Sequence, residues 1–108
     1  MSRSILILLG HPDRDSLCGA LAQRYATAAE NAGHQVRLIA LGELEFDPVL
    51  RHGYRQIQPL EPDLQDAADA IEACDHLVLV HPTWWGAMPA LLKGFFDRVL
   101  LPGYAFRY

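Results

Sequence analysis

Two short runs of consecutive apolar residues, Ile5 to Leu9 and Leu77 to Val80, constrain the fold of this chain most strongly. An uninterrupted apolar run of this length is typical of a parallel strand that is buried on both faces of its sheet. The second run ends at His81-Pro82, because proline cannot donate a hydrogen bond to the sheet and keeps the residue before it extended. We therefore predict buried strands over residues 4–9 and 77–80.

A helix and a further strand are predicted directly after the first run. Residues 16–32 form the predicted helix, with Asp15 or Ser16 able to cap its start and Gly33 suited to its left-handed end. The apolar side chains at helical spacing are Leu17, Leu21, Tyr25, Ala28 and Ala32. Residues 35–40 predict a second strand, more exposed than the first. Because a crossover helix joins these two strands, we expect them to be parallel.

The second half of the chain predicts two more helices, one on each side of the second apolar run. Residues 41–62 are irregular, and a loop of this length inside a compact domain is more often functional than idle. Residues 63–74 and 89–100 predict the helices, and Pro89 suits a first helical position. One face of the first of them carries Leu64, Ala67, Ala68 and Ile71.

Three parallel strands that alternate with helices predict a doubly wound α/β fold with strand order 2-1-3. In this order the strands over residues 4–9 and 77–80 are neighbours. The loops that leave their carboxyl ends, residues 10–16 and 81–88, then lie side by side at the topological switch point, where open α/β sheets bind ligands. We therefore expect the functional site to be built from these two loops.

The composition predicts one globular domain over residues 1–108. The formal net charge is -4 and the nine Lys and Arg residues are scattered, which argues against nucleic acid or an anionic membrane surface as a partner. No apolar stretch reaches the roughly 20 residues that cross a bilayer. The apolar run near the start of the chain is too short for the hydrophobic region of a signal peptide. Cys18 and Cys74 lie far apart, as expected of free thiols in the cytoplasm.

The first loop has features that favour an anion such as phosphate. It leads into the amino end of a helix, where unpaired N–H groups and the helix dipole attract negative charge. Ser16 adds a hydroxyl group, and His11 and Arg14 can add positive charge. Asp13 and Asp15 oppose an anion, so at least one of them must point away or act only as a cap. The alternative interpretation is a plain capped turn.

The second loop offers planar aromatic surface. Trp84 and Trp85 stand among backbone amides and suit a flat heterocycle with ring nitrogens and carbonyls; the alternative is that they pack on the long loop or on a partner subunit. Phosphate at one loop and an aromatic ring at the other describe a flavin nucleotide. Two other interpretations are less favoured. A phosphoacceptor receiver domain would need an aspartate at the position of His81. A metal site at His11 and His81 is also less favoured, because histidines at strand ends are more often hydrogen-bonding groups than metal ligands. We therefore expect no metal site at His11 and His81.

Three segments of the sequence carry a resemblance to a known family. They are HPDRDSLCGAL at residues 11–21, PTWWGAMPALLKGFFDR at residues 82–98 and GYAF at residues 103–106. Together they resemble the NAD(P)H:quinone oxidoreductase family, the flavodoxin-like group that includes the NAD(P)H dehydrogenases and the ancillary oxidoreductases of glutathione-gated potassium efflux. The resemblance covers nearly the whole chain, in order, and implies a flavodoxin-like fold.

The resemblance also implies which residues contact the cofactor and the substrate. The family positions that hold the flavin phosphate are matched by His11, Ser16, Leu17 and Cys18. The loop that lies along the isoalloxazine ring is matched by Pro82, Thr83, Trp84, Trp85 and Gly86. Phe106 and Tyr108 match an aromatic patch that lines the substrate pocket across a dimer interface. Lys93 and Asp97, at i and i+4, are more simply a pair on the helix surface than catalytic groups.

The activity implied by the resemblance is hydride transfer from NAD(P)H to FMN or FAD, followed by two-electron transfer to a quinone-like acceptor, in a homodimer. Family members are much longer, so strands 4 and 5 and the tyrosine and histidine implicated in hydride transfer are expected to lie beyond the chain end. The strand over residues 77–80 then has an open apolar edge. Either the chain is a truncated gene product or another chain covers this edge, and our hypothesis is that a second copy of the chain does so. The alternative is a flavodoxin-like regulatory or binding module without turnover, such as an ancillary subunit that acts on a peripheral partner.

Overall fold

The computed structural model describes residues 2–101 and contains every predicted strand and helix, with bounds shifted by one residue at most. In chain order the elements are β1 (Ser4–Leu9), α1 (Leu17–Asn31), β2 (Gln35–Ala40), the 3-10 helix η1 (Leu41–Glu43), α2 (Pro62–Ala73), β3 (His76–Val80) and α3 (Ala90–Val99). Pro89 precedes α3 as its N-cap instead of occupying the first helical position. Within residues 2–101, no helix is long and apolar enough to cross a membrane.

The three strands form one parallel sheet in the order β2-β1-β3, which confirms the predicted topology. Ser4 lies opposite Gln35 of β2, and Ile5 lies opposite His76 of β3. At the carboxyl end, the Gly10 N–H donates to the Val80 carbonyl at 2.8 Å, so the two strands stay paired up to their final residues. The loops that follow β1 and β3 therefore start side by side.

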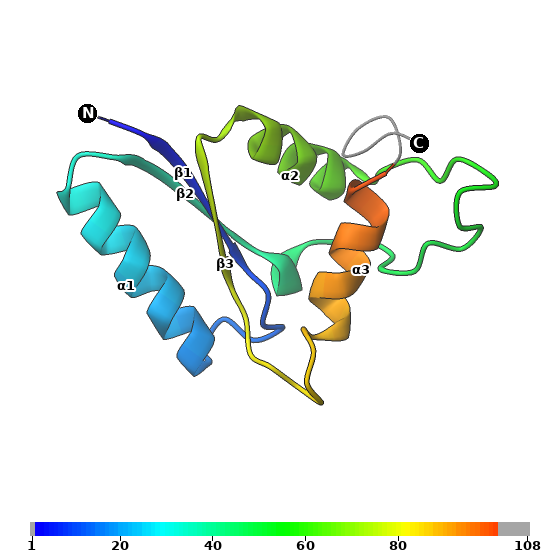
Figure 1. Ribbon diagram of the computed structural model, residues 1–108, viewed down its shortest axis with the longest axis horizontal. Helices are drawn as coiled ribbons and strands as arrows, with labels where there is room; N and C mark the ends of the chain where they lie inside the picture. Colours follow the sequence, from blue (N-terminus) through cyan, green and yellow to red (C-terminus); the bar gives the residue numbers. More distant parts are fainter. Residues whose placement is uncertain (1, 102–108) are drawn as a thin grey trace.

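The helices cover both faces of the sheet, with α1 on one face and α2 and α3 on the other (Figure 1). Successive side chains of β1 point to opposite faces. Ile7 packs with Ala22 and Ala26 of α1, whereas Leu8 packs on the other face in the cluster that contains Phe95 of α3. All of these side chains are buried, so β1 is the centre of both hydrophobic layers. This arrangement is the doubly wound, flavodoxin-like architecture expected from the sequence.

The buried face of α1 differs from the predicted one. The predicted apolar positions are all exposed, namely Leu17, Leu21, Tyr25, Ala28 and Ala32. The helix instead contacts the sheet through small residues, Gly19, Ala22 and Ala26. Small side chains let the helix axis approach the large residues of β1, so the closest packing selects this face over the one with the larger apolar residues. The prediction for this face was therefore wrong, although the helix itself is present.

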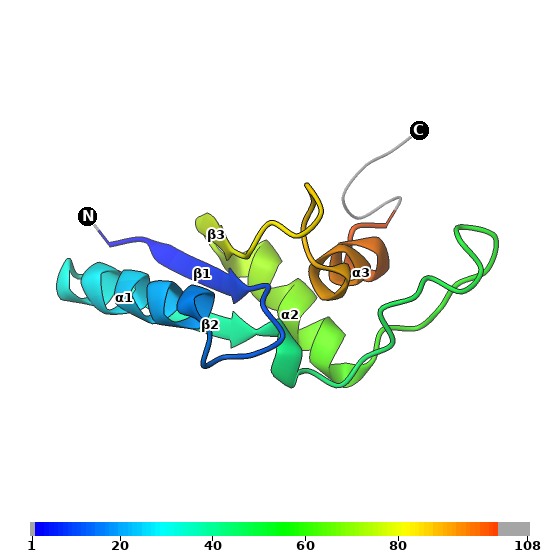
Figure 2. The same cartoon turned by 90° about the horizontal axis from the view of Figure 1, so that it is seen from below.

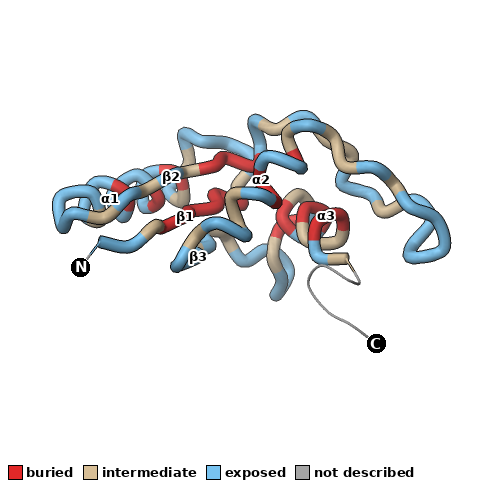
Figure 3. Tube along the Cα trace, turned by 90° about the horizontal axis from the view of Figure 1, so that it is seen from above, coloured by how far each residue is buried: buried red, intermediate tan, exposed pale blue. Residues whose placement is uncertain are grey.

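Strand β3 is less buried than its apolar sequence predicts. Leu77 is 39% exposed and Leu79 is 41% exposed, whereas Val78 and Val80 are half-buried beside α1. Figure 3 shows the contrast between the buried β1 and the more exposed β3. The reason is position, because β3 is an edge strand with a neighbour on one side alone among the described residues. The prediction of a strand buried on both faces is corrected in this respect.

A loop of residues 44–61 connects η1 to α2, and its middle part projects past α3 (Figures 1 and 2). We call residues 48–58 the arm. The buried guanidinium of Arg98 on α3 donates to the carbonyls of Asp47 and Pro59, which flank the arm, and pairs with Glu61 at 2.8 Å. A single side chain therefore joins both ends of the arm to α3.

Candidate functional site

The loop after β1 is organised by local side-chain contacts. The Asp13 N–H donates to His11 Nδ1 at 2.9 Å, and the Asp15 N–H donates to Asp13 Oδ1 at 2.9 Å. Because His11 Nδ1 accepts a hydrogen bond, its ring proton lies on Nε2 when the imidazole is neutral. The Asp13 carboxylate acts as a turn cap, which is one of the two roles predicted for the acidic residues of this loop.

Ser16 is the N-cap of α1, one of the two residues predicted for that role. Its Oγ accepts the Gly19 N–H at 3.1 Å and donates to the Asp13 carbonyl at 2.7 Å. The N–H groups of Leu17 and Cys18 form no hydrogen bond within the described part of the chain. They are first-turn donors with no partner inside the helix, which is the local feature that favours an anion.

The Arg14 side chain forms an ion pair with η1. Its Nε and Nη2 donate to the two carboxylate oxygens of Glu43 in η1, at 2.8 and 3.0 Å. Its hydrogen bonds lower the pKa of Glu43 below that of a free carboxyl group. The positive charge of Arg14 is engaged by Glu43 in this structure, and the role predicted for it at an anion stays a prediction.

The loop after β3 contains a tight reverse turn that presents a tryptophan. Trp84 and Ala87 form an isolated antiparallel bridge, with backbone hydrogen bonds of 2.8 and 3.1 Å in the two directions. Both residues between them have positive φ, 55° at Trp85 and 73° at Gly86, as in a type I′ turn. Glycine adopts this conformation freely, but tryptophan does so at a cost of about 1–2 kcal/mol. The Trp85 side chain is fully exposed, so no core contact explains its position.

The two loops meet through their aromatic rings. The rings of His11 and Trp84 lie with centroids 5.3 Å apart and at 76° to each other, in an edge-to-face contact. His81, at the end of β3, has its Nδ1 2.8 Å from the Pro82 carbonyl. A carbonyl oxygen only accepts, so this contact orients the His81 ring with its proton on Nδ1. The contact between His11 and Trp84 brings the predicted halves of the site into one place.

The two loops and the first turn of α1, at the carboxyl ends of β1 and β3, contain nine of the predicted site residues, toward the bottom of Figure 1. They are His11, Ser16, Leu17, Cys18, Pro82, Thr83, Trp84, Trp85 and Gly86. Phe106 and Tyr108 lie outside the described residues. The role of each residue stays a prediction, whereas their proximity is a property of the fold.

The sequence analysis missed Gly19, which lets the first loop fold against α1. A Cβ atom at this position would lie 1.8 Å from the Arg14 carbonyl oxygen, so no larger residue fits without moving the loop. The glycine inside a predicted helix was a signal for such a close approach. Both cysteines are free, as predicted, and no group of three or more potential metal ligands is present within residues 2–101.

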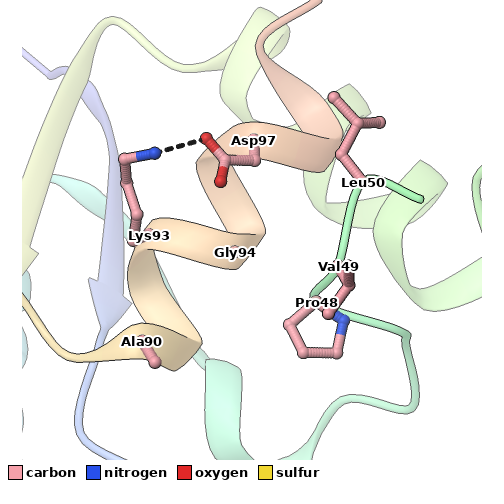
Figure 4. Close-up of a pocket in the computed structure, with 7 residues that line it drawn as sticks. All are labelled: Pro48, Val49, Leu50, Ala90, Lys93, Gly94 and Asp97. Carbon is pink, nitrogen blue, oxygen red and sulfur yellow. Dashed lines mark hydrogen bonds and ion pairs between the residues drawn. The ribbon is translucent and has the colours of Figure 1, made fainter. Parts of the chain in front are cut away.

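A hollow of about 600 Å³ on the described surface lies away from these loops (Figure 4). It is lined by Pro48, Val49 and Leu50 at the base of the arm and by Ala90, Lys93, Gly94 and Asp97 of α3. Lys93 Nζ lies 2.6 Å from Asp97 Oδ1 at the rim, which confirms the pair predicted on the helix surface. The hollow is broad and open, and no residue of the two loops lines it, so it does not replace them as the candidate site.

The chain matches known proteins over most of its length. A family model described as a flavodoxin-like fold matches residues 3–108. An uncharacterized NAD(P)H oxidoreductase of Haemophilus influenzae is 36% identical over 106 residues, which cover 94% of this chain and 52% of the relative. The chain spans about half the length of the curated relatives it matches.

Solved structures of similar proteins also match the chain. An NAD(P)H:quinone oxidoreductase from Methanothermobacter marburgensis has a TM-score of 0.87 and 31% identity, and the match covers 100% of this chain and 58% of that one. An NADH:FMN oxidoreductase in its apo form has a TM-score of 0.67 and 28% identity, and the match covers 90% of this chain and 50% of that one. The chain therefore belongs to the flavodoxin-like fold family, and the relatives it resembles within that family are NAD(P)H oxidoreductases.

Proposed function

We propose that the two loops bind a flavin nucleotide, FMN or FAD. The observation that carries this proposal is the contact between His11 and Trp84, which places an anion-binding helix start beside an exposed aromatic surface. The similarity to an NADH:FMN oxidoreductase supports the same cofactor class. The flavin phosphate would lie at His11, Ser16, Leu17 and Cys18.

The residues at the phosphate position fit an anion through backbone donors more than through charge. The N–H groups of Leu17 and Cys18 are available, and the Ser16 hydroxyl borders them. Arg14 is paired with Glu43, and the exposed Asp13 and Asp15 carboxylates lie nearby. Binding would therefore depend on the geometry of the helix start, and we expect a modest affinity for the phosphate alone.

The second loop would hold the flavin ring. Trp84 is 45% exposed and Trp85 is fully exposed, so both offer apolar ring surface without loss of core packing. Pro82, Thr83 and Gly86 supply backbone groups next to that surface, and the absence of a side chain at Gly86 leaves room there. Strained backbone of the kind found at Trp85 concentrates at functional sites.

The reaction we propose is two-electron oxidoreduction between NAD(P)H and a quinone-like acceptor. A bound flavin would supply the chemistry of two-electron transfer between the nicotinamide and the acceptor. The residues of this chain would bind and orient the flavin and exclude water from one side of it. None of the described residues is assigned a catalytic role, and Phe106 and Tyr108 are proposed to line the acceptor pocket in a cytoplasmic homodimer. The names of the relatives support the NAD(P)H and quinone substrates.

A binding module without turnover is the second candidate. The two loops alone suffice for such a module, because it needs a binding surface and no group that acts on a substrate. Such a module would hold flavin, or the partner of a larger assembly, with the same two loops. The difference between the candidates is turnover, because both predict flavin binding.

Titration with FMN and with FAD tests the proposal. The chain contains two tryptophans, and both lie in the second loop, so tryptophan fluorescence reports on this loop alone. Quenching that saturates, together with a shifted flavin absorption spectrum, is the expected result. Fluorescence that responds to neither flavin would contradict the proposal. If flavin binds, oxidation of NADH or NADPH with a soluble quinone then separates the enzyme from the binding module.

A further inference from the structure

The loop after β1 is held from outside by η1, the 3-10 helix that follows β2. Gly42 of η1 lies so close to this loop that a Cβ atom at its position would lie 2.3 Å from the Pro12 carbonyl oxygen. Backbone therefore meets backbone here, with no side chain between the two segments. A residue larger than glycine fits at position 42 only if η1 or the loop moves.

An ion pair forms a second contact between η1 and the same loop. The guanidinium of Arg14 donates from Nε and Nη2 to the two carboxylate oxygens of Glu43, at 2.8 and 3.0 Å. A two-point pair of this kind fixes the orientation of both side chains as well as their distance. Both side chains are about half exposed, so the pair contributes little to global stability. Its effect is local, on where the loop lies.

The core of the protein holds η1 in place. The side chain of Leu41, the first residue of η1, is fully buried and packs in the same core cluster as Phe95 of α3. The strand before it, β2, pairs with β1 up to the residue that precedes η1. Gly42 and Glu43 therefore tie the loop to an element that is itself anchored in the core.

The position of the loop matters for the open donors at the start of α1. The N–H groups of Leu17 and Cys18 form no hydrogen bond within residues 2–101, and a carboxylate suits them as well as a phosphate does. The loop itself carries two carboxylates, Asp13 and Asp15, just before the helix. In this structure the Asp13 carboxylate accepts the Asp15 N–H instead. A loop that moved freely would let either carboxylate reach the donors and compete with a phosphate.

We propose that Glu43 is a positioning residue for the anion site, which it assists although its own charge repels an anion. By holding Arg14, it keeps the loop and its two carboxylates away from the N–H groups of Leu17 and Cys18. These donors then remain open to a phosphate monoester such as that of FMN. Gly42 supports the same placement through its backbone contact. This inference rests on the proposed flavin site and gives a role to η1, which contains none of the predicted site residues.

The positioning role and simple electrostatics predict opposite signs for the loss of Glu43. If Arg14 and Glu43 acted through their charges alone, removal of the carboxylate would leave an unpaired cation beside the loop and strengthen phosphate binding. In the positioning role, the same change releases the loop and weakens phosphate binding. Loss of Arg14 weakens phosphate binding in both cases. Glu43→Ala is therefore the variant that separates the two explanations.

Fluorescence titration with FMN and with riboflavin, which lacks the phosphate, isolates the contribution of the loop after β1. The ratio of the two dissociation constants measures the phosphate preference, because both ligands share the flavin ring. We expect Glu43→Ala to lower this preference by about threefold or more, as for residues coupled in one contact network. An unchanged or increased preference in Glu43→Ala would overturn the proposal.

A double-variant cycle tests whether the two side chains act as one unit. Arg14→Ala, Glu43→Ala and the variant with both changes should have similar phosphate preferences, because either single change already releases the loop. Additive losses would overturn the proposal. Asp66→Ala is the matched control, because it removes a carboxylate from the exposed pair of Asp66 with Arg37, and it should keep the preference of the parent. A loss of equal size in this control would indicate a general effect of charge and would also overturn the proposal.

Gly42→Ala tests the backbone contact. Gly42 is not among the glycines with positive φ, so alanine changes the contact with Pro12 without straining its own backbone. The added methyl group must displace the loop or η1, and we expect a lower phosphate preference with riboflavin affinity unchanged. A folded Gly42→Ala variant with the phosphate preference of the parent would overturn the role of this contact.

Amide hydrogen exchange of the flavin-free chain tests the placement of the loop without any ligand. The N–H groups of Asp13, Asp15 and Ser16 are hydrogen-bonded within the loop, and their exchange, followed by NMR, reports how often the loop opens. Exchange should be faster in Glu43→Ala and unchanged in Asp66→Ala. Parent-like exchange in Glu43→Ala would overturn the proposal. If the parent bound neither flavin, the flavin site alone would be contradicted, and the exchange rates would still decide whether Glu43 positions the loop.

Discussion

Arg98, which is buried, and Glu61, which is partly exposed, form an ion pair that joins α3 to the residue before α2. Arg98 Nη2 lies 2.8 Å from Glu61 Oε1, with 1% of the Arg98 side chain exposed. Glu61 Oε2 also accepts the Asp47 N–H at 2.6 Å, so the same carboxylate closes the base of the arm. These residues lie 37 positions apart in sequence, and their contact decides where the arm leaves the body of the protein.

Replacing Arg98 by methionine is expected to destabilise the protein strongly. Loss of one partner of a fully buried ion pair costs about 3–5 kcal/mol, and the loss here should be smaller, because Glu61 is 31% exposed and its charge stays partly solvated. The carbonyls of Asp47 and Pro59 lose their donor as well. Urea unfolding followed by circular dichroism measures the change. Arg37→Met is the control, since its pair with Asp66 is largely exposed, and it should change the free energy of unfolding little. Equal losses in the two variants would contradict a special role for Arg98.

The same ion pair predicts a dependence of stability on pH. The hydrogen bond from Arg98 holds the pKa of Glu61 below that of a free glutamate, which is about 4.3. The folded protein therefore binds this proton less readily than the unfolded chain. The stabilisation is fully present above the unfolded pKa and is lost as the pH falls through the lower folded pKa. The gap in free energy of unfolding between the parent and Glu61→Gln should be largest near neutral pH and shrink below about pH 4. A gap that is constant from neutral pH to pH 3 would argue against this ionisation.

Ser16 allows the capping and binding roles of the first loop to be separated. Ser16→Ala removes the N-cap of α1 and should cost about 1 kcal/mol of stability. Ser16→Asp can keep the cap and should retain the stability of the parent, but it adds a negative charge where the flavin phosphate is proposed to lie. Its affinity for FMN should therefore fall well below that of the parent and of Ser16→Ala. Fluorescence titration and urea unfolding of the three proteins provide the test. If Ser16→Asp bound FMN as tightly as the parent, the result would contradict the proposed position of the flavin phosphate.

The strained turn of the second loop predicts opposite effects at its two central residues. Trp85→Gly should raise the free energy of unfolding by about 1 kcal/mol, because glycine adopts a positive φ without strain. The same variant should bind flavin more weakly, since it removes an exposed aromatic ring. Gly86→Ala should lower stability by about 1 kcal/mol, since its φ is 73° and its Cβ would meet no neighbour. Loss of stability in Trp85→Gly would mean that the ring packs against the protein.

The strands, the helices and the two site loops could all be predicted from the sequence. Apolar runs and proline positions are local signals, and β1 and β3 appear within one residue of their predicted bounds. The convergence of the loops followed from the parallel strand order, since neighbouring parallel strands end at the same edge. The contact between His11 and Trp84 is the direct consequence.

The partners of charged side chains could not be predicted in the same way. Arg14 was expected to serve an anion, but it pairs with Glu43, 29 residues away. Apart from its place in the family motif, nothing in the sequence indicated that Arg98 would be buried, yet it is among the most buried residues. Both contacts depend on how η1, the arm and α3 dock onto the sheet. No local pattern encodes that docking.

The sequence by itself determined which segments form strands and helices and which two loops meet, because these depend on local periodicity and on one topological rule. The tertiary structure decided which faces are buried. Helix α1 packs its small residues on the sheet, because small side chains let the helix approach β1 closely, and Leu17, Leu21 and Tyr25 are exposed. Within residues 2–101, strand β3 has an apolar sequence but a neighbour on one side alone, and burial of a strand depends on its neighbours as well as on its own residues.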